Sequence, residues 1–271
     1  MNQPFWKMHG AGNDFILIDD REKTFPDQNH DLIRRIATPK YGIGSEGVIL
    51  IQPSESADFR MRFYNPDGSE VEMCGNGARC VARLAHEIGV APASMKFDTV
   101  AGVIAAEMQG DDQVQLTMTR PKDLQLNAEL VLQDQPLKYH FVNSGVPHVV
   151  IELQDLANQD IHSLGAAIRY HEAFQPNGTN VNFIEITGPD SLNVRTYERG
   201  VEAETLACGT GMVACGLIAG SLGKVSTPVK ITCASGDLLE INYQATENDF
   251  EHVTLTGPAV HVFKGEIDIA S

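Results

Sequence analysis

The sequence predicts an α+β protein of two pseudo-symmetric domains, each a curved mixed or antiparallel sheet wrapped around a central hydrophobic helix. Three observations support this prediction. Strand-like alternation occurs in more segments than helical periodicity, one cysteine-containing motif occurs once in each half of the chain, and each copy precedes an apolar, Ala-containing helical segment. A chain of 271 residues is long enough for two domains of ordinary size.

The individual elements follow from periodicity. Alternation of apolar and polar residues predicts strands over residues 15–19, 48–52, 59–64, 103–108, 114–118, 149–153, 181–186, 192–197, 238–243 and 253–256. Helical periodicity is confined to residues 31–37, 78–88, 161–170 and 212–222. Gly89 and Gly223 directly follow two of these helices, in the position of C-terminal capping glycines.

The repeated motif reads Met73-Cys74-Gly75-Asn76-Gly77 in the first half and Ala207-Cys208-Gly209-Thr210-Gly211 in the second. The two cysteines are 208 − 74 = 134 residues apart, about half the chain. Upstream of each cysteine stand a predicted strand with an arginine and then an acidic Glu-x-Glu connection. We interpret this as an internal duplication, with residues 119–123 as the linker between its halves.

Composition excludes several classes of function. The 20 basic and 36 acidic residues give a formal charge of −16, which repels nucleic acid and anionic lipid. The N-terminus has no signal-peptide pattern, and the five cysteines do not form a disulfide framework, so we expect a cytoplasmic protein with reduced thiols. Residues 205–223 are uncharged but rich in glycine, which favours a closely packed buried helix over a membrane span.

Cys74 and Cys208 are the candidate catalytic residues. A cysteine at a helix N-terminus lies near backbone N–H groups and the positive end of the helix dipole, so its pKa is expected to fall below about 8.5. Two such thiols can move a proton from one face of a carbon to the other, one as base and one as acid. The amides of Gly75, Asn76, Gly209 and Thr210 can then meet the charge that develops on an adjacent carboxylate, in place of a cofactor.

Other candidate sites are weaker. Cys80, Cys215 and Cys233 are interpreted as buried structural residues, and no cysteine has a partner at metal-ligand spacing, so we expect no metal. The turn before His148 makes that histidine a possible assisting residue. Residues 42–47 match Gly-x-Gly-x-x-Gly, but the order helix, loop, strand is opposite to that of a dinucleotide site, so these glycines are assigned to turns.

Several segments together resemble the diaminopimelate epimerases. They are Lys7-Met8-His9-Gly10-Ala11-Gly12-Asn13-Asp14-Phe15, Phe63-Tyr64-Asn65-Pro66-Asp67-Gly68-Ser69, Met73-Cys74-Gly75-Asn76-Gly77-Ala78-Arg79, Tyr197-Glu198-Arg199-Gly200 and Ala207-Cys208-Gly209-Thr210-Gly211. The resemblance continues to Gly257-Pro258-Ala259-Val260-His261-Val262 and covers essentially the whole chain.

The resemblance implies inversion at one amino acid α-carbon by two thiols, without pyridoxal phosphate, another cofactor or a metal, in a cleft between two domains. It further implies a homodimer and a C-terminal segment that returns to the first domain, giving domains of residues 1–118 with 261–271 and of residues 119–260. Cys74 and Cys208 match the two catalytic positions. The positions that match substrate-holding residues are Asn13, Asn65, Asn180, Glu198 and Arg199, together with the amides of Gly75, Asn76, Gly209 and Thr210; His148 matches a polar neighbour of the reacting centre.

Two departures bear on the substrate. Val146 stands where many members have asparagine, and Gly47 where some have glutamine. The leading hypothesis is interconversion of LL- and meso-diaminopimelate, with a racemase for histidine or a proline derivative as the alternative. From other classes, a thiol redox protein and a non-catalytic amino-acid-binding protein remain open, although the chain has no Cys-x-x-Cys.

Overall fold

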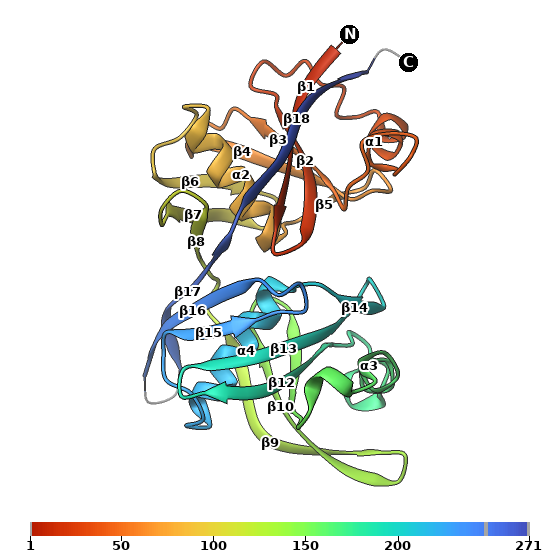
Figure 1. Ribbon diagram of the computed structural model, residues 1–271, viewed down its shortest axis with the longest axis vertical. Helices are drawn as coiled ribbons and strands as arrows, with labels where there is room; N and C mark the ends of the chain where they lie inside the picture. Colours follow the sequence, from red (N-terminus) through yellow and green to blue (C-terminus); the bar gives the residue numbers. More distant parts are fainter. Residues whose placement is uncertain (1, 247–248, 270–271) are drawn as a thin grey trace. The chain divides into compact units, whose positions relative to one another are not determined.

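The structure is a computed structural model that describes residues 2–246 and 249–269. The chain divides into two compact units, which we call unit 1 (Met1–Leu116 with Gly257–Ser271) and unit 2 (Thr117–Thr256) (Figure 1). The sequence places the corresponding boundaries after residues 118 and 260. Residues 1, 270 and 271 of the expected first domain lie outside the described residues.

Unit 1 is a mixed sheet with two helices. Its elements are β1 (Asn2–Gly10), β2 (Asn13–Asp19), α1 (His30–Ala37), β3 (Val48–Gln52), β4 (Phe59–Tyr64), β5 (Glu70–Val71), α2 (Gly75–Glu87), β6 (Ser94–Thr99), β7 (Gly102–Met108), β8 (Gln113–Thr117) and β18 (Val260–Asp268). The β2–β3 and β4–β6 pairs are parallel; the pairs β1–β2, β3–β4, β4–β5, β6–β7 and β7–β8 are antiparallel. The last strand, β18, runs antiparallel to β1 from Asn2↔Asp268 to His9↔Val260.

Unit 2 repeats this arrangement. Its elements are β9 (Lys122–Leu132), β10 (Gln135–Asn143), β11 (Pro147–Glu152), η1 (Leu156–Asn158), α3 (Ile161–Arg169), η2 (Glu172–Phe174), β12 (Asn180–Gly188), β13 (Ser191–Glu198), β14 (Ala203–Thr205), α4 (Gly209–Ser221), β15 (Val229–Thr232), β16 (Leu238–Ala245) and β17 (Phe250–Pro258). The β11–β12 and β13–β15 pairs are parallel and the remaining pairs are antiparallel.

The two units therefore share one topology. In order, β1 to β8 of unit 1 correspond to β10 to β17 of unit 2, α1 corresponds to α3, and α2 to α4. The closing strands correspond as well, because β18 pairs with β1 and β9 pairs with β10. This confirms the predicted α+β class and the internal duplication.

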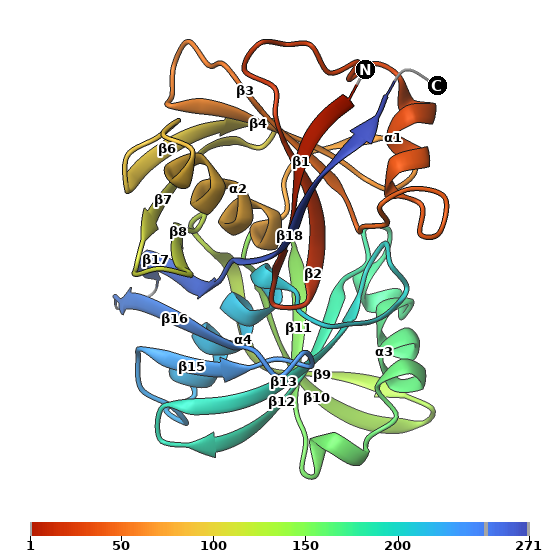
Figure 2. The same cartoon turned by 45° about the horizontal axis from the view of Figure 1, so that its top comes forward.

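Helices on both faces explain the apolar strands of unit 1. Figures 1 and 2 show β2 and β3 between α1 and α2. Ile16, Ile18 and Leu50 belong to the hydrophobic cluster that includes the buried face of α1. Phe15 and Ile49 point to the other side, where they approach Gly77 of α2. A strand covered on both faces cannot alternate with polar residues, and every residue of β3 is buried.

Unit 2 is built in the same way around α4. Val181 and Phe183 of β12 pack in a hydrophobic core with residues of α3, and the alternate residues of that strand, Asn180 and Asn182, lie on the opposite face. Residues 211–219 of α4 are all buried. Small residues permit this packing, because a Cβ at Gly216 would lie 3.2 Å from Cβ of Ile241.

Most of the predicted elements are confirmed, including all four helices within three residues at each end. Gly89 and Gly223 have φ of 71° and 68°, as expected of C-terminal caps. The residues predicted as linker are partly wrong, because β9 begins at Lys122. The strands that the sequence did not predict are β1, β5, β6, β9, β10, β14, β15 and β18.

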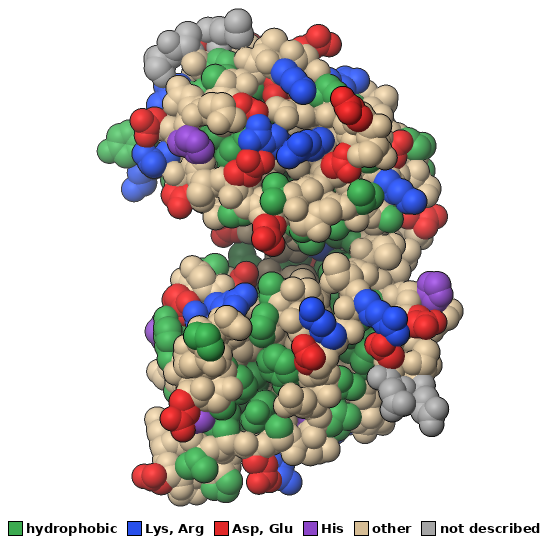
Figure 3. All heavy atoms as spheres, turned by 180° about the vertical axis from the view of Figure 1, so that it is seen from behind, with side chains coloured by type: hydrophobic (Ala, Val, Ile, Leu, Met, Phe, Trp, Pro, Cys, Tyr) green, Lys and Arg blue, Asp and Glu red, His purple; other side chains and the backbone are tan. Residues whose placement is uncertain are grey.

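The surface carries both signs of charge. On the face shown in Figure 3, Lys and Arg side chains are interspersed with Asp and Glu in both units. Among the described residues, no helix is long and apolar enough to cross a membrane.

Candidate functional site

Both motif cysteines begin a helix. Cys74 is the N-cap residue of α2 and Cys208 is the N-cap residue of α4, each with extended backbone angles (φ −131° and −117°). Neither side chain caps its own helix by a hydrogen bond. Each sulfur therefore lies at the end of a helix where backbone N–H groups lack intrahelical acceptors, as the sequence predicted.

In unit 1 the sulfur of Cys74 lies beside Asn13, the first residue of β2. Cys74 Sγ donates to Asn13 Oδ1 over 3.5 Å, and Nδ2 of Asn76 donates to the same oxygen over 3.4 Å. The Nδ2 group of Asn13 donates to the carboxylate of Glu46. The structure thus brings together three of the predicted residues, Asn13, Cys74 and Asn76, and adds Glu46, which the sequence analysis missed.

Arg79 holds Asn76 from inside the unit. Its guanidinium is fully buried, donates from Nη2 to Asn76 Oδ1 over 2.9 Å and from Nε to the carbonyl of Pro258 over 3.2 Å. Gly10 makes room for this arrangement, because a Cβ there would lie 2.8 Å from the Asn76 carbonyl oxygen. The β1–β2 hairpin and the start of α2 are therefore packed backbone to backbone.

An ion pair between the buried Lys7 and the partly exposed Asp14 positions the loop that carries Glu46. Lys7 Nζ lies 2.6 Å from the Asp14 carboxylate and also donates to the carbonyl of Gly44. The backbone N–H of Glu46 donates to Asp14 Oδ1 over 3.0 Å. Gly44, with φ of 77°, and its neighbours form the turn expected for residues 42–47, between α1 and β3.

The departure at Gly47 has a steric cause. A Cβ at this position would lie 2.3 Å from a ring carbon of Phe63. A larger side chain therefore requires Phe63 to move, so glycine here belongs to the packing of this chain's own core.

Asn65 follows β4 and opens the tight turn of residues 65–68. The N–H of Gly68 donates to the Asn65 carbonyl over 2.9 Å, and Gly68 has φ of 86°. Arg34 of α1 donates to the carbonyl of Asp67 over 3.1 Å, and His30 bonds the carbonyl of Gly68. Helix α1 thus holds the turn that carries Asn65.

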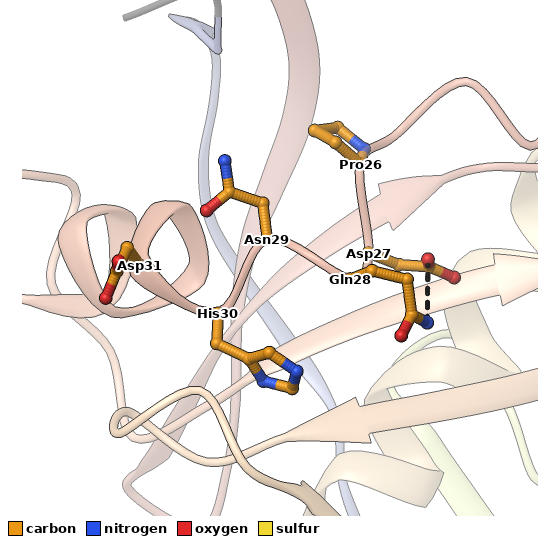
Figure 4. Close-up of a pocket in the computed structure, with 6 residues that line it drawn as sticks. All are labelled: Pro26, Asp27, Gln28, Asn29, His30 and Asp31. Carbon is orange, nitrogen blue, oxygen red and sulfur yellow. Dashed lines mark hydrogen bonds between the residues drawn. The ribbon is translucent and has the colours of Figure 1, made fainter.

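A surface pocket lies at the start of α1 and is lined by residues 26–31 (Figure 4). Gln28 donates to Asp27 over 3.2 Å, and the other Asp27 oxygen accepts from Arg62 and Gln52. Asn29 caps α1. These side chains support the fold, and none of the predicted site residues lines this pocket.

In unit 2 a chain of side chains leads to Cys208. Its Sγ lies 3.7 Å from Oγ1 of Thr210, the same Oγ1 lies 2.9 Å from Nε2 of His148, and Nδ1 of His148 lies 3.1 Å from Nδ2 of Asn182. His148 and Asn182 are fully buried and Cys208 is 8% exposed. Burial, with a smaller contribution from the positive charge of Arg199, lowers the pKa of His148 to about 3, so its ring is neutral.

Asn182 is not among the site residues predicted from the sequence. The sequence nevertheless carries a signal for it: Asn180 and Asn182 occupy alternate positions of an otherwise apolar strand, which places two amides on one buried face. The β11–β12 register brings this face beside His148, because His148 pairs with Asn180 and Val150 with Asn182.

The turn of residues 143–147 packs on the first residues of α4. Ser144 Oγ donates to the carbonyl of Thr210 over 2.7 Å, and a Cβ at Gly145 would lie 3.5 Å from the methyl group of Thr210. A Cβ at Gly211 would lie 2.4 Å from Asn182 Oδ1. Thr210 is therefore the residue at which the turn, His148 and the helix start meet, and Val146 belongs to this turn.

Glu198 and Arg199 end β13 and begin the turn to β14. Glu198 accepts from the Thr205 hydroxyl over 2.8 Å, and burial raises the pKa of its carboxyl. Asn180 joins the two turns of the unit, because its Oδ1 accepts from the N–H of Arg199 over 2.8 Å and its Nδ2 donates to the carbonyl of Pro147 over 3.1 Å. Arg199 Nη1 donates to the carbonyl of Asn177 over 2.7 Å.

The other three cysteines are buried, as the sequence predicted. Burial raises the pKa of the Cys80 thiol to about 12 and raises that of Cys215 as well, so both stay protonated. Within residues 2–246 and 249–269, no group of three or more His, Cys, Asp or Glu side chains has the arrangement of a metal site.

Comparison with known proteins gives one consistent family. The sequence model described as diaminopimelate epimerase matches residues 5–124 and 140–262. The chain is 40% identical over 274 residues to a diaminopimelate epimerase of Aquifex aeolicus, with 97% of each chain covered. It is 44% identical over 271 residues to a diaminopimelate epimerase of a Hydrogenobaculum species, with 96% of each chain covered.

Solved structures agree on the fold. A phenazine biosynthesis protein of the PhzF family from Bacillus anthracis superposes with a TM-score of 0.76 over 99% of this chain and 100% of its own, at 15% sequence identity. At that identity the likeness concerns architecture alone.

Proposed function

Because this chain belongs to the diaminopimelate epimerase family, we propose that it interconverts LL- and meso-diaminopimelate, without a cofactor, in lysine and peptidoglycan precursor biosynthesis. The observation that carries the proposal is that Cys74 and Cys208 occupy the same N-cap position in two corresponding helices. Two thiols at the same position of corresponding helices suit a reaction that runs by the same chemistry in both directions.

The proposed reaction moves one proton at each step. The thiolate of one cysteine takes the α-proton, leaving the electron pair on the α-carbon and adjoining carboxylate. The thiol of the other cysteine then delivers its proton to the opposite face of that carbon. The first cysteine ends as a thiol and the second as a thiolate, so the reverse reaction uses the same groups in exchanged roles.

Helix N-termini supply the stabilisation that a cofactor otherwise provides. The backbone N–H groups of Gly75 and Asn76 in α2, and of Gly209 and Thr210 in α4, belong to first turns whose N–H groups lack intrahelical acceptors. Pointed at the reacting carboxylate, these donors stabilise the charge that develops as the α-proton leaves.

The second amino acid group of diaminopimelate needs its own partners. We assign its carboxylate to Arg199, because a guanidinium can bind a carboxylate by two parallel hydrogen bonds, and its ammonium group to Glu198. Asn180 holds the backbone of Arg199 and so positions this contact. Asn13 and Asn65 complete the proposed substrate contacts, and His148 assists through Thr210.

The remaining properties follow the same resemblance. We propose a cytoplasmic homodimer with two domains, residues 1–118 with 261–271 and residues 119–260, whose substrate is a small amino acid. The formal charge of −16 argues against a nucleic acid partner.

Isotope exchange tests the function directly. In deuterated buffer, diaminopimelate should take deuterium at one α-carbon while its LL and meso forms interconvert. Cys74→Ser and Cys208→Ser should each lower interconversion by at least about a thousandfold, because a serine hydroxyl is far less acidic than a thiol: it is almost never ionised near neutral pH, so it cannot serve as the base, and it gives up its proton far less readily as the acid. Binding of diaminopimelate should survive in both variants. Unchanged turnover in both would remove the thiols from the reaction.

Val146 supports one other candidate substrate. It stands in the turn that packs on Thr210, where many family members have asparagine. A racemase for histidine or a proline derivative is therefore worth testing, by incubation with single enantiomers and chiral separation. Faster inversion of any of these than of diaminopimelate would reassign the substrate.

A further inference from the structure

The two cysteines have the same relation to their helices but different hydrogen-bond partners. Each is an N-cap residue, so helix dipole and N–H groups act on both sulfurs alike. Cys208 lies beside a hydroxyl, whereas Cys74 lies beside an amide oxygen. A hydroxyl can donate to sulfur, but an amide oxygen can only accept from it.

In unit 2 the donor and acceptor of each hydrogen bond that leads to Cys208 are determined by the group farthest from the sulfur, the carbonyl of Val149. The carbonyl of Val149 can only accept, and Nδ2 of Asn182 lies 2.9 Å from it, which determines the orientation of this amide. The second proton on Nδ2 then points to Nδ1 of His148, and Oδ1 accepts from the Thr196 hydroxyl over 3.0 Å.

The orientation of the Asn182 amide in turn fixes the hydrogen bonds of His148 and Thr210. We call this chain of hydrogen bonds, from Asn182 through His148 and Thr210 to Cys208, the relay. A neutral ring that accepts at Nδ1 carries its proton on Nε2, so Nε2 donates to Oγ1 of Thr210. The hydroxyl proton of Thr210 is then available for the sulfur of Cys208, 3.7 Å away. A donor to sulfur stabilises the thiolate.

In unit 1 two charged groups, Arg79 and Glu46, determine which atoms donate and which accept around Cys74. The Arg79 guanidinium can only donate, so Oδ1 of Asn76 faces it and Nδ2 of Asn76 faces Asn13. The carboxylate of Glu46 accepts from Nδ2 of Asn13. Both constraints leave Oδ1 of Asn13 toward the sulfur of Cys74, where it accepts the thiol proton.

We infer that the free enzyme rests with Cys208 as the thiolate and Cys74 as the thiol, and that Asn182 and Asn13 are the positioning residues that set this asymmetry. The names base and acid rest on the proposed function, but the proton states do not and can be measured without substrate. The low pKa of His148 supports the neutral ring that the relay requires, and Arg199 is the charged group that reinforces it.

The asymmetry adds a step to the cycle. In the direction that starts from the resting form, Cys208 takes the α-proton and Cys74 gives its own. The enzyme is then left with a Cys208 thiol and a Cys74 thiolate. One proton must pass from Cys208 to Cys74, through solvent or directly, before the resting form returns.

Alkylation measured against pH tests the proton states. The enzyme without substrate is treated with iodoacetamide, and modification of each cysteine is followed by mass spectrometry. The midpoint in pH, unlike the rate, does not depend on how accessible each sulfur is. We expect the midpoint of Cys208 to lie at least about one pH unit below that of Cys74, a tenfold difference in acidity.

Two variants test the relay. Thr210→Val removes the hydroxyl at nearly constant volume and should raise the Cys208 midpoint while leaving that of Cys74 in place, so Cys74 is the internal control. Thr210→Ser retains the hydroxyl and should keep the low midpoint. A Cys74 midpoint below that of Cys208, or no effect of Thr210→Val, would overturn the inference.

Nitrogen NMR of the unmodified protein tests the tautomer without any substitution. We expect Nδ1 of His148 to resonate as an unprotonated ring nitrogen and Nε2 as an N–H. A proton on Nδ1 would make Nε2 an acceptor for the Thr210 hydroxyl, leave no hydroxyl proton for Cys208, and overturn the inference. Failure of the proposed function is a separate result, namely the absence of α-deuterium exchange in diaminopimelate with both midpoints as expected.

Discussion

Asn182 Nδ2 donates to Nδ1 of His148 over 3.1 Å, in a part of unit 2 where both side chains are fully buried. Because that amide also donates to the backbone of Val149, its orientation is part of the sheet. The histidine is therefore held neutral and in one tautomer by the fold itself, and several measurable consequences follow.

The first consequence is a pH dependence of stability. His148 has a pKa of about 3 in the folded protein against about 6.5 when unfolded, so protons bind the unfolded state first as the pH falls below 6.5. Stability is lost through that window, by about 2 kcal/mol between pH 7 and pH 5. Urea unfolding at both pH values should show this loss in the wild type, and a smaller loss by that amount in His148→Gln. Equal losses in the two proteins would contradict the assignment.

The second concerns Glu198. The Thr205 hydroxyl donates to its carboxylate and lowers its pKa, against the larger effect of burial, which raises it. Thr205→Val removes that donor, so the pKa should rise further and the acidic limb of kcat/KM for epimerisation should move to higher pH. Thr205→Ser keeps the hydroxyl and should keep the limb in place. A limb that stays put in Thr205→Val would show that Glu198 need not be ionised.

The third compares corresponding glycines of the two helices. A Cβ at Gly211 would lie 2.4 Å from Asn182 Oδ1, which hydrogen bonds hold in place, whereas a Cβ at Gly77 would lie 2.8 Å from the flexible end of Ile49. Gly211→Ala should therefore cost about 2 kcal/mol or more of unfolding free energy, and Gly77→Ala at least about 1 kcal/mol less. Chemical denaturation decides the order, and a larger cost at Gly77 would refute it.

The fourth tests the buried guanidinium of unit 1. Arg79→Leu leaves the carbonyl of Pro258 and the amide oxygen of Asn76 without these donors, so the free energy of unfolding should fall by about 3 kcal/mol. Arg21→Ala removes an exposed partner of Asp19 and should cost less than about 1 kcal/mol. Similar urea midpoints for the two variants would contradict a stabilising role of the Arg79 hydrogen bonds.

Much of the fold can be predicted because its signals are local. The helices show apolar periodicity, and the cysteine before each glycine pair marks a helix start. The longest strand that was not predicted, β9, is mostly exposed, and β18 is exposed over much of its length. Such strands are fixed by pairing with β10 and β1 rather than by an apolar face, so their sequences alternate only weakly.

The residues of the candidate site likewise fall into those with a local sequence signal and those positioned by distant parts of the chain. The cysteines and the adjoining amides could be predicted because all belong to one short motif. The roles of Asn182 and Glu46 could not be predicted, because each acts on a cysteine through other side chains and across 26 or more residues of sequence. The alternation of Asn180 and Asn182 marks a buried polar face, but only strand register and loop packing show which side chains that face meets.

The positions of the two closing strands in the chain, β9 before unit 2's other strands and β18 after them, also set an order of folding during synthesis. Unit 2 is one continuous stretch, complete once Thr256 has left the ribosome, but β1 must wait for its partner β18, which follows unit 2 in the chain. A chain that stops between the end of unit 2 and the start of β18 therefore has a complete unit 2 but lacks the strand that pairs with one edge of β1. Limited proteolysis should cleave unit 1 of such a chain faster than unit 1 of the full chain.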